Sequence, residues 1–264
     1  MKNWFPFKKR PPLVAVIRLS GTIGTGGRAL NDEGIAPLIE KAFKRKKPAA
    51  VALIINSPGG SPVQSSLIAA RIRRLANEKS VPVHAFVEDV AASGGYWLAT
   101  AADQIWVDES SVIGSIGVIS SSFGAHVFLA RQGIERRVHT SVKSKSMLDP
   151  FLPEKKEDVE RLKGILGDLH TNFTLQVRER RGTKLNSKQD LFTGEFWLGR
   201  KAMDLGLVDG IAHLQPKMKA IYGDKVRFAN YGKKRGLLQR FGSAMMQDAI
   251  TTIEERADYA RYGL

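Results

Sequence analysis

Two glycine turns hold the residues of this chain that are best suited to chemistry. The first, residues 56–60, follows the apolar run 50–55, and the second, residues 91–96, comes soon after the run 81–87. Where a strand ends in such a turn and a helix begins, several backbone N–H groups lack an intrahelical partner, and the helix dipole adds positive potential. Two such turns in one domain can donate two hydrogen bonds to one developing oxyanion, which is what acyl transfer requires.

The second turn also contains a hydroxyl group. Ser93 stands directly before Gly94, and a nucleophile whose neighbour's N–H group faces the same oxyanion is a recurrent arrangement in hydrolases. The chain has no cysteine, which excludes thiol nucleophiles, thiolate metal sites and disulfides. Serine is therefore the candidate nucleophile. The alternative is that Ser93 only caps the helix that begins there, because serine is a preferred cap residue.

A serine hydroxyl needs a base, because it is a weak nucleophile on its own. The five histidines show no spacing that is typical of a base or a metal site; they stand at positions 84, 126, 139, 170 and 213. A lysine that burial keeps neutral is the other option, since desolvation lowers the pKa of an amine. The residues alone do not choose among 41 lysines and arginines. No metal or cofactor is expected.

Alternating strand and helix patterns position these turns, and they predict a layered α/β fold with parallel strands. Strands are expected at residues 13–19, 50–55, 81–87, 105–107 and 112–119, the last of them broken by Gly114 and Gly117. Helices are expected at 32–47, from Ser61 onward, in a small-residue stretch that ends at Ala102, at 123–131 and at 153–181. The last of these helices carries a single apolar stripe, which is typical of a core or a subunit interface: Val159, Leu162, Leu166, Leu169, Phe173 and Val177.

Composition excludes disordered and fibrous classes, because 264 residues with 43% apolar and 25% charged side chains are ordinary for a globular enzyme. The net charge of +15 first suggests nucleic acid or anionic lipid as a partner. Much of the excess, however, lies at helix ends and after Gly223, so we expect no nucleic acid and keep an anionic membrane surface as a candidate. No signal peptide is visible, and the apolar runs are about a third of the roughly 20 residues that span a membrane.

Four motifs in a fixed order extend the two turns. They are residues 56–60, 91–96, 113–118 and 192–209. In this order they resemble the signal peptide peptidase A / SohB family of Ser-Lys serine peptidases, which belongs to the Clp/crotonase superfamily. The resemblance runs from about Leu13 to Ile211. It implies a Clp/crotonase-like α/β fold with repeated β-β-α units and strand–Gly-Gly–helix turns.

The resemblance also divides the chain and implies an assembly. We expect a basic N-terminal segment at 1–11, a peptidase domain at 12–222, and a basic C-terminal extension at 223–264 with an amphipathic helix. Members of the superfamily work as rings or barrels, so a homo-oligomer, from tetramer to octamer, is expected. The family's transmembrane anchor is not visible, and the expected location is the cytoplasm or the periphery of a membrane in a bacterium.

Carried over position by position, the resemblance assigns the catalytic roles. Ser93 is the nucleophile, Lys145 is the general base, favoured over Lys143, and Ser115 orients that lysine. The oxyanion donors match Gly59, Gly60 and Gly94. The peptide substrate is expected to pair as an added β-strand beside Ser61, Pro62, Gly114, Ile116, Gly117 and Val118.

These residues predict a serine endopeptidase that hydrolyses signal peptides or other small apolar peptides through an acyl-enzyme. Two alternatives stay open. A crotonase-type acyl-CoA enzyme uses the same paired-glycine oxyanion hole but needs neither Ser93 as nucleophile nor Lys145 as base. A non-catalytic basic membrane-binding module needs no active site at all.

Overall fold

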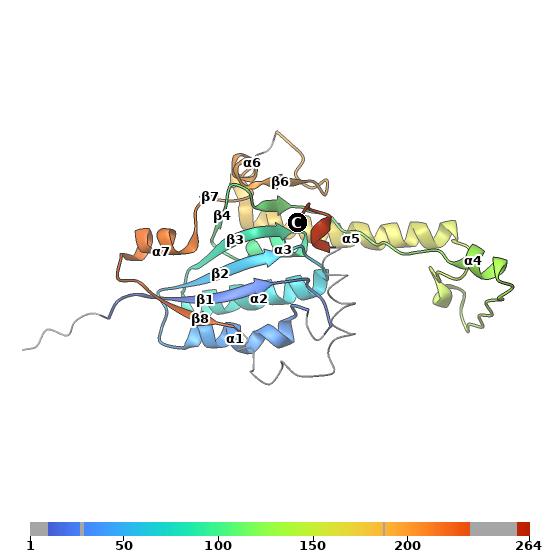
Figure 1. Cartoon of the computed structure of the whole chain (residues 1–264), viewed down its shortest axis with the longest axis horizontal. Helices are drawn as coiled ribbons and strands as arrows, with labels where there is room; N and C mark the ends of the chain where they lie inside the picture. Colours follow the sequence, from blue (N-terminus) through green and yellow to red (C-terminus); the bar gives the residue numbers. More distant parts are fainter. Residues whose placement is uncertain (1–9, 27–28, 187, 233–257) are drawn as a thin grey trace, which may run out of the picture.

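A predominantly parallel sheet forms the body of the protein. The computed structural model describes residues 10–26, 29–186, 188–232 and 258–264. The strand order is β6-β5-β3-β2-β1-β8, and β4 pairs with both β3 and β7. Among the described strands, β5 and β6 form the one antiparallel pair, and all other pairs are parallel. The strands are β1 (Leu13–Ser20), β2 (Ala50–Ser57), β3 (Val83–Ala92), β4 (Gln104–Val107), β5 (Val112–Gly114), β6 (Phe196–Leu198), β7 (Gly210–Ile211) and β8 (Arg227–Tyr231). The predicted α/β fold is thus confirmed (Figure 1).

Helices join these strands, and some extend away from them (Figure 1). They are α1 (Asp32–Lys44), α2 (Pro62–Lys79), α3 (Gly94–Ala99), α4 (His126–Arg131), α5 (Lys156–Arg181), α6 (Gly199–Asp204) and α7 (Leu214–Tyr222), with short 3₁₀ turns η1 (Lys143–Ser146) and η2 (Gly182–Lys184). The sequence signals explain the starts of α1 and α2. Asn31 caps α1 by accepting from the N–H group of Gly34, and Ser61 caps α2 ahead of Pro62.

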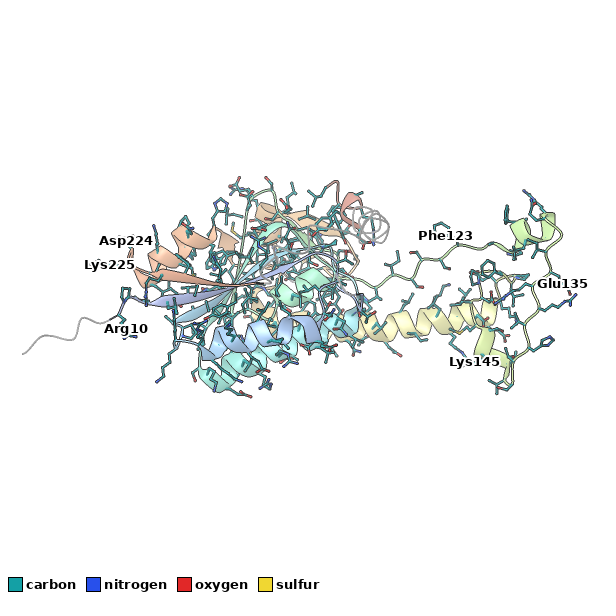
Figure 2. All side chains as sticks on the ribbon, turned by 60° about the horizontal axis from the view of Figure 1, so that its bottom comes forward. Arg10, Phe123, Glu135, Lys145, Asp224 and Lys225 are labelled. Carbon is teal, nitrogen blue, oxygen red and sulfur yellow. The ribbon has the colours of Figure 1, made fainter. Side chains whose placement is uncertain are left out.

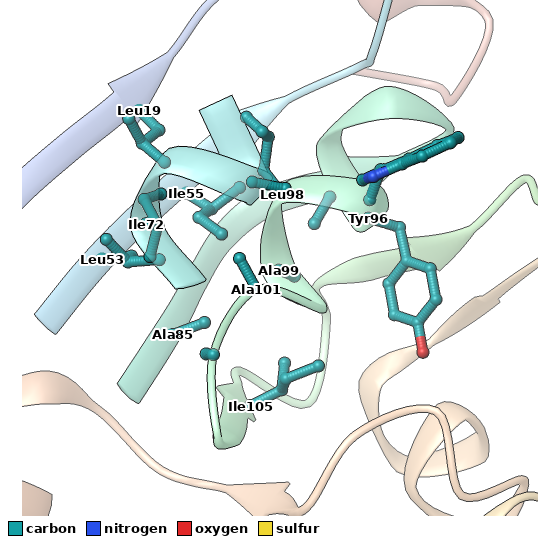
Figure 3. Close-up of a cluster of buried hydrophobic side chains, with 14 of the residues drawn as sticks. Leu19, Leu53, Ile55, Ile72, Ala85, Tyr96, Leu98, Ala99, Ala101 and Ile105 are labelled. Carbon is teal, nitrogen blue, oxygen red and sulfur yellow. The ribbon is translucent and has the colours of Figure 1, made fainter. Parts of the chain in front are cut away.

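The main core lies between the sheet and helices α1, α2 and α3. Apolar side chains from the strands, such as Leu53, pack there against Ile72 of α2 and Leu98 of α3 (Figure 3). A smaller cluster on the opposite face of the sheet includes Met218 of α7. Because β2 is buried on both faces, its sequence is the continuous apolar run that a central parallel strand requires.

The chain turns away from the sheet after β5, earlier than the predicted strand at 112–119. Gly114 and Ser115 have φ angles of +117° and +51°, which end the extended conformation there. The following residues, with α4, η1 and the first part of α5, form an arm that projects from the body (Figures 1 and 2). We define the arm as residues 119–165.

The predicted apolar stripe of α5 is only partly buried. Phe173 and Val177 reach the main core, whereas Val159, Leu162, Leu166 and Leu169 are half-buried in and near the arm. The base of α5 is fixed to the body by charge: Arg181 is buried and pairs with Asp209 at 2.7 Å, and Lys184 pairs with the other oxygen of that carboxylate at 2.7 Å.

Two described segments fall within the expected C-terminal extension, 223–264. Arg227–Tyr231 form β8, an edge strand of the main sheet beside β1. Residues 258–264 return to the other end of the sheet, where Tyr259 and Tyr262 pack against Val90, Ala92 and Val112. The amphipathic helix predicted around residues 238–253 lies outside the described residues.

Candidate active site

Ser93 occupies a strained turn between β3 and α3. Its φ and ψ angles are 51° and −122°, a left-handed conformation that non-glycine residues rarely adopt. The turn is held by the Ser93 N–H group, which donates to the carbonyl of Gly114 at 2.8 Å. The Ser93 side chain makes no cap hydrogen bond to α3, so the capping alternative is not supported. This strand–turn–helix geometry presents a hydroxyl outward, as in serine hydrolases.

The structure brings the two predicted glycine turns into direct contact. A Cβ atom on Gly59 would lie 2.8 Å from the Cβ of Ser93 and from the backbone nitrogen of Gly94, and a Cβ on Gly94 would lie 3.4 Å from the nitrogen of Gly60. The backbones can approach this closely only because the side chains are absent. The nitrogens of Gly60 and Gly94 therefore lie side by side next to Ser93.

Of the three predicted oxyanion donors, the geometry favours Gly60 and Gly94. The N–H group of Gly59 donates to the Oγ of Ser57 at 3.2 Å inside the protein, so it does not face a substrate. Gly94 begins α3, where first-turn N–H groups have no intrahelical partner. The N–H groups of Gly60 and Gly94 therefore remain the candidate oxyanion donors.

A cleft of about 560 Å³ opens beside Ser93. Most of the predicted site residues line it, namely Gly59, Gly60, Ser61, Pro62, Ser93, Gly94, Ser115, Gly117 and Val118. Ile116 is instead fully buried in the main core, and the carbonyl of Gly114 is occupied by Ser93. These two residues do not line the cleft, and their pairing with a substrate strand stays a prediction.

The sequence did not point to the apolar floor of the cleft. Trp97 of α3 and Phe173 of α5 stack there with ring centroids 4.9 Å apart and planes at 21°. Phe173 was assigned only to a stripe, because nothing local shows that α5 returns to the nucleophile. The floor offers an apolar side chain a place to bind.

A second unpredicted wall comes from the described C-terminal residues. The Tyr262 hydroxyl lies 3.3 Å from the carbonyl oxygen of Pro58 and 3.4 Å from the Oγ of Ser115, and its ring meets Phe196 edge-on. Arg261 lines the same cleft. Residues more than a hundred positions apart in the chain thus share the cleft that contains Ser93 and Ser115.

Lys145 is not brought to Ser93 within one chain. It lies in η1 on the arm, exposed and far from the sheet (Figure 2). Lys143, the less favoured candidate, pairs with Glu157 at 2.9 Å. The predicted base and the predicted nucleophile therefore belong to separate parts of the molecule.

The described residues contain no group of three or more histidine, aspartate or glutamate side chains arranged to hold a metal ion. Nor does any described helix have both the length and the apolar character needed to cross a membrane.

Comparison with known proteins places the chain in a family. The model of peptidase family S49 matches residues 75–225. The chain is 30% identical to "Putative protease MJ0651" of Methanocaldococcus jannaschii over 70% of its own length and 58% of that protein. It is also 30% identical to "Probable protease SohB" of Buchnera aphidicola over 80% of its own length and 67% of that protein.

A third relative is much larger than this chain. The chain is 47% identical, over 95% of its length, to a protein of Brucella abortus named "Na(+)/H(+) antiporter NhaA", of which it covers 37%. The chain thus spans well under two thirds of several of its relatives. The matched range, residues 75–225, covers more than half of the chain and contains the positions of Ser93, Ser115 and Lys145. The chain belongs to peptidase family S49, as its resemblance to the signal peptide peptidase A / SohB proteins indicated.

Proposed function

We propose that this chain is a serine endopeptidase in which Ser93 attacks the peptide bond and Lys145, from the arm of a second copy, takes its proton. The observation that carries the proposal is the strained Ser93 turn packed against the Gly60 turn at the edge of a cleft. The proposal includes a Clp/crotonase-like fold, because that fold is expected to place paired glycine turns after parallel strands.

The geometry supports a two-step mechanism. The Ser93 Oγ attacks the substrate carbonyl as the lysine amine removes its proton, and the N–H groups of Gly60 and Gly94 donate to the oxyanion. When the tetrahedral intermediate collapses, the C–N bond breaks and the lysine returns the proton to the leaving amine. The same lysine then removes a proton from a water molecule as its oxygen attacks the ester carbonyl. When the C–O bond to Ser93 breaks, the lysine returns this proton to the Ser93 Oγ, which frees the serine and the acid product.

The position of Lys145 favours a base supplied by another chain. A lysine amine in water is protonated at neutral pH, and burial is what makes it neutral. Docking of the arm on a second copy would both remove water from Lys145 and bring it near Ser115. Exposed apolar side chains along the arm fit such a contact, among them Ile119, Phe123, Val127, Phe128, Ile134 and Val142. We propose a homo-oligomer, from tetramer to octamer, on this basis.

The cleft favours apolar peptides as substrates. The stacked rings of Trp97 and Phe173 would hold an apolar side chain next to Ser93. Gly117 and Val118 on one side and Ser61 and Pro62 on the other line the path of an extended peptide. Signal peptides and other small apolar peptides fit this description. The net charge of +15 supports a place beside an anionic membrane surface.

A mixing experiment tests the mechanism. We expect Ser93→Ala and Lys145→Ala each to reduce hydrolysis of a signal peptide by at least ~10³-fold. An equimolar mixture of the two inactive proteins should recover activity, because one copy then offers the serine and another the lysine. Lys143→Ala is the matched control and should stay active.

A serine-directed fluorophosphonate probe completes the test. It should label the wild-type chain and fail to label Ser93→Ala. Labelling that does not depend on Ser93, or unchanged hydrolysis by either single variant, would contradict the proposal. A folded wild-type chain that neither hydrolyses peptide nor is labelled would favour a crotonase-type enzyme or a binding module.

A further inference from the structure

Ser57 lies at a junction behind the oxyanion turn. It is the last residue of β2 and has 0% of its surface exposed. The pairing of β2 with β3 shifts register between Ile55 and Ser57, so the sheet is irregular at this residue. A buried hydroxyl at such a place needs its hydrogen bonds satisfied from neighbouring segments.

The Ser57 hydroxyl connects two segments of the chain that are distant in sequence. Its Oγ donates to the carbonyl of Gly21 at 2.7 Å and accepts from the N–H group of Gly59 at 3.2 Å. Gly21 begins the loop after β1, and Gly59 belongs to the first glycine turn. One oxygen atom thus fixes the distance between that loop and that turn.

The loop after β1 in turn holds both sides of Gly60. The N–H group of Ile23 donates to the carbonyl of Gly59 at 2.7 Å, and the N–H group of Ser61 donates to the carbonyl of Ile23 at 2.8 Å. A Cβ on Gly60 would lie 2.0 Å from that same Ile23 carbonyl oxygen. The direction of the Gly60 N–H group therefore depends on where the loop sits.

Ser57 also supports the nucleophile turn through its backbone. A Cβ on Gly95 would lie 2.3 Å from the carbonyl oxygen of Ser57, so the first turn of α3 rests on this residue. Ser57 therefore contacts the first turn of α3, which follows Ser93, and is hydrogen-bonded to the glycine turn that contains Gly60.

We infer that Ser57 is a positioning residue that sets the Gly60 N–H group against Ser93. The inference rests on the proposed function. Without the hydroxyl, the N–H group of Gly59 and the carbonyl of Gly21 lose a buried partner, and the turn must move to find another. The developing oxyanion would then lose part of its stabilisation, which the uncharged substrate in the ground state does not need.

Ser111 provides a matched control. It is also buried, with 1% exposed, and its Oγ donates to the carbonyl of Glu88 at 2.5 Å and accepts from the N–H group of Asp108 at 3.0 Å. It makes the same kinds of hydrogen bonds as Ser57 without touching either glycine turn. Ser111→Ala should match the structural loss of Ser57→Ala but not its kinetic loss.

The experiment compares Ser57→Ala and Ser111→Ala in the full chain, by kcat and KM for a peptide, by the rate of fluorophosphonate labelling, and by thermal unfolding. We expect Ser57→Ala to lower kcat roughly 10- to 100-fold, somewhat less than outright removal of an oxyanion donor. KM should change by less than about twofold, and labelling should slow together with kcat, because both report the acylation step.

Equal kcat values in the two variants would overturn the inference, as would a change in KM alone. If Ser57→Ala does not fold, Ser57→Cys keeps the volume and replaces the hydroxyl by a weak hydrogen-bonding thiol, and the same loss of kcat is expected. A wild-type chain that neither hydrolyses peptide nor labels at Ser93 would instead count against the proposed function itself.

Discussion

The two halves of the proposed dyad lie in very different surroundings. Ser93 is held by a backbone hydrogen bond to Gly114 and by close contact with the Gly59 turn, in a region packed on the main core. Lys145 stands in a short 3₁₀ turn on an exposed arm. The Ser93 turn and the two glycine turns are thus brought together within one chain, whereas Lys145 of the same chain lies far from them. In the proposed mechanism, the surroundings of Lys145 depend on the copy against which the arm docks.

Gly95→Ala tests the surroundings of Ser93 and should have the largest effect on peptidase activity. A Cβ there would lie 2.3 Å from the backbone oxygen of Ser57, which cannot move aside as a flexible side chain would. We expect nearly complete loss of peptidase activity and a clear drop in the midpoint of thermal unfolding. Wild-type kinetics in this variant would show that the nucleophile turn tolerates displacement.

Gly167→Ala is the matched change in α5, where no described atom outside the neighbouring residues and the helix's own backbone lies within 4 Å of the added Cβ. Alanine in a helix is favoured over glycine by about 0.5–1 kcal/mol, so activity should persist and the unfolding midpoint should hold or rise slightly.

Dilution tests whether Lys145 acts on Ser93 of another copy of the chain. If Lys145 reaches Ser93 only between copies, the activity per mole of chain should fall steeply once the concentration drops below that of assembly. Measuring hydrolysis together with mass by light scattering would relate the two. Activity that stays constant in a solution of monomers would break the comparison, because the base would then come from the same chain.

Asp209→Asn tests the ion pairs with Arg181 and Lys184 that fix the end of α5 to the body of the protein. Burial acts to raise the pKa of Asp209, but hydrogen bonds from Arg181 and Lys184 outweigh it and leave the pKa below its ordinary value. Loss of the charge leaves Arg181 buried without its partner. We expect a loss of about 2 kcal/mol in the free energy of unfolding, less than for a fully buried pair because water reaches the edge of the cluster.

The pH dependence follows from the direction of that shift. A carboxylate whose pKa is lower in the folded state stabilises the fold above its unfolded pKa of about 4, and that stability is lost as the pH falls through the folded value. The wild-type unfolding midpoint should therefore decline below about pH 4, and the decline should be smaller in Asp209→Asn. Parallel curves for the two proteins would show that other carboxylates dominate.

Lys143→Ala should have the smallest effect. Its ion pair with Glu157 lies on the surface of the arm, with 77% and 55% of the two side chains exposed, and such pairs contribute little. Peptidase activity and the unfolding midpoint should both remain near the wild-type values. Loss of activity in Lys143→Ala, with activity retained in Lys145→Ala, would reverse the choice between the two lysines.

Local sequence patterns predicted the parts of the site that depend on short segments, namely the two glycine turns. Apolar runs followed by Gly-Gly placed Ser93, Gly60 and Gly94 together, because parallel strands end at one edge of the sheet. The strand predicted at 112–119 was too long: a break was expected at Gly114, but the sequence does not show that Gly114 and Ser115 end the strand there.

Other parts depended on contacts between distant segments. Trp97 meets Phe173 and Ser115 meets Tyr262 only in the folded chain, so no window of sequence contains either pair. Ser57 belongs to the first glycine turn, which was predicted as a whole to bind the oxyanion. Only the two hydrogen bonds of the Ser57 hydroxyl distinguish the role that we infer for it from the role of the glycines. The place of Lys145 on an arm could not be deduced from its neighbours.

The pairing of β1 with β8 has a consequence for how the protein is made. Leu13, near the start of the chain, pairs with Arg227, near its end, and β1 is an interior strand of the sheet only when β8 is present. All residues between these two strands must therefore be synthesised before this edge can close. Pairings of such long range slow folding, because the entropy of closing the loop is lost before the contact forms. Until β8 pairs with it, β1 exposes an unpaired edge, and such edges make folding intermediates prone to aggregation.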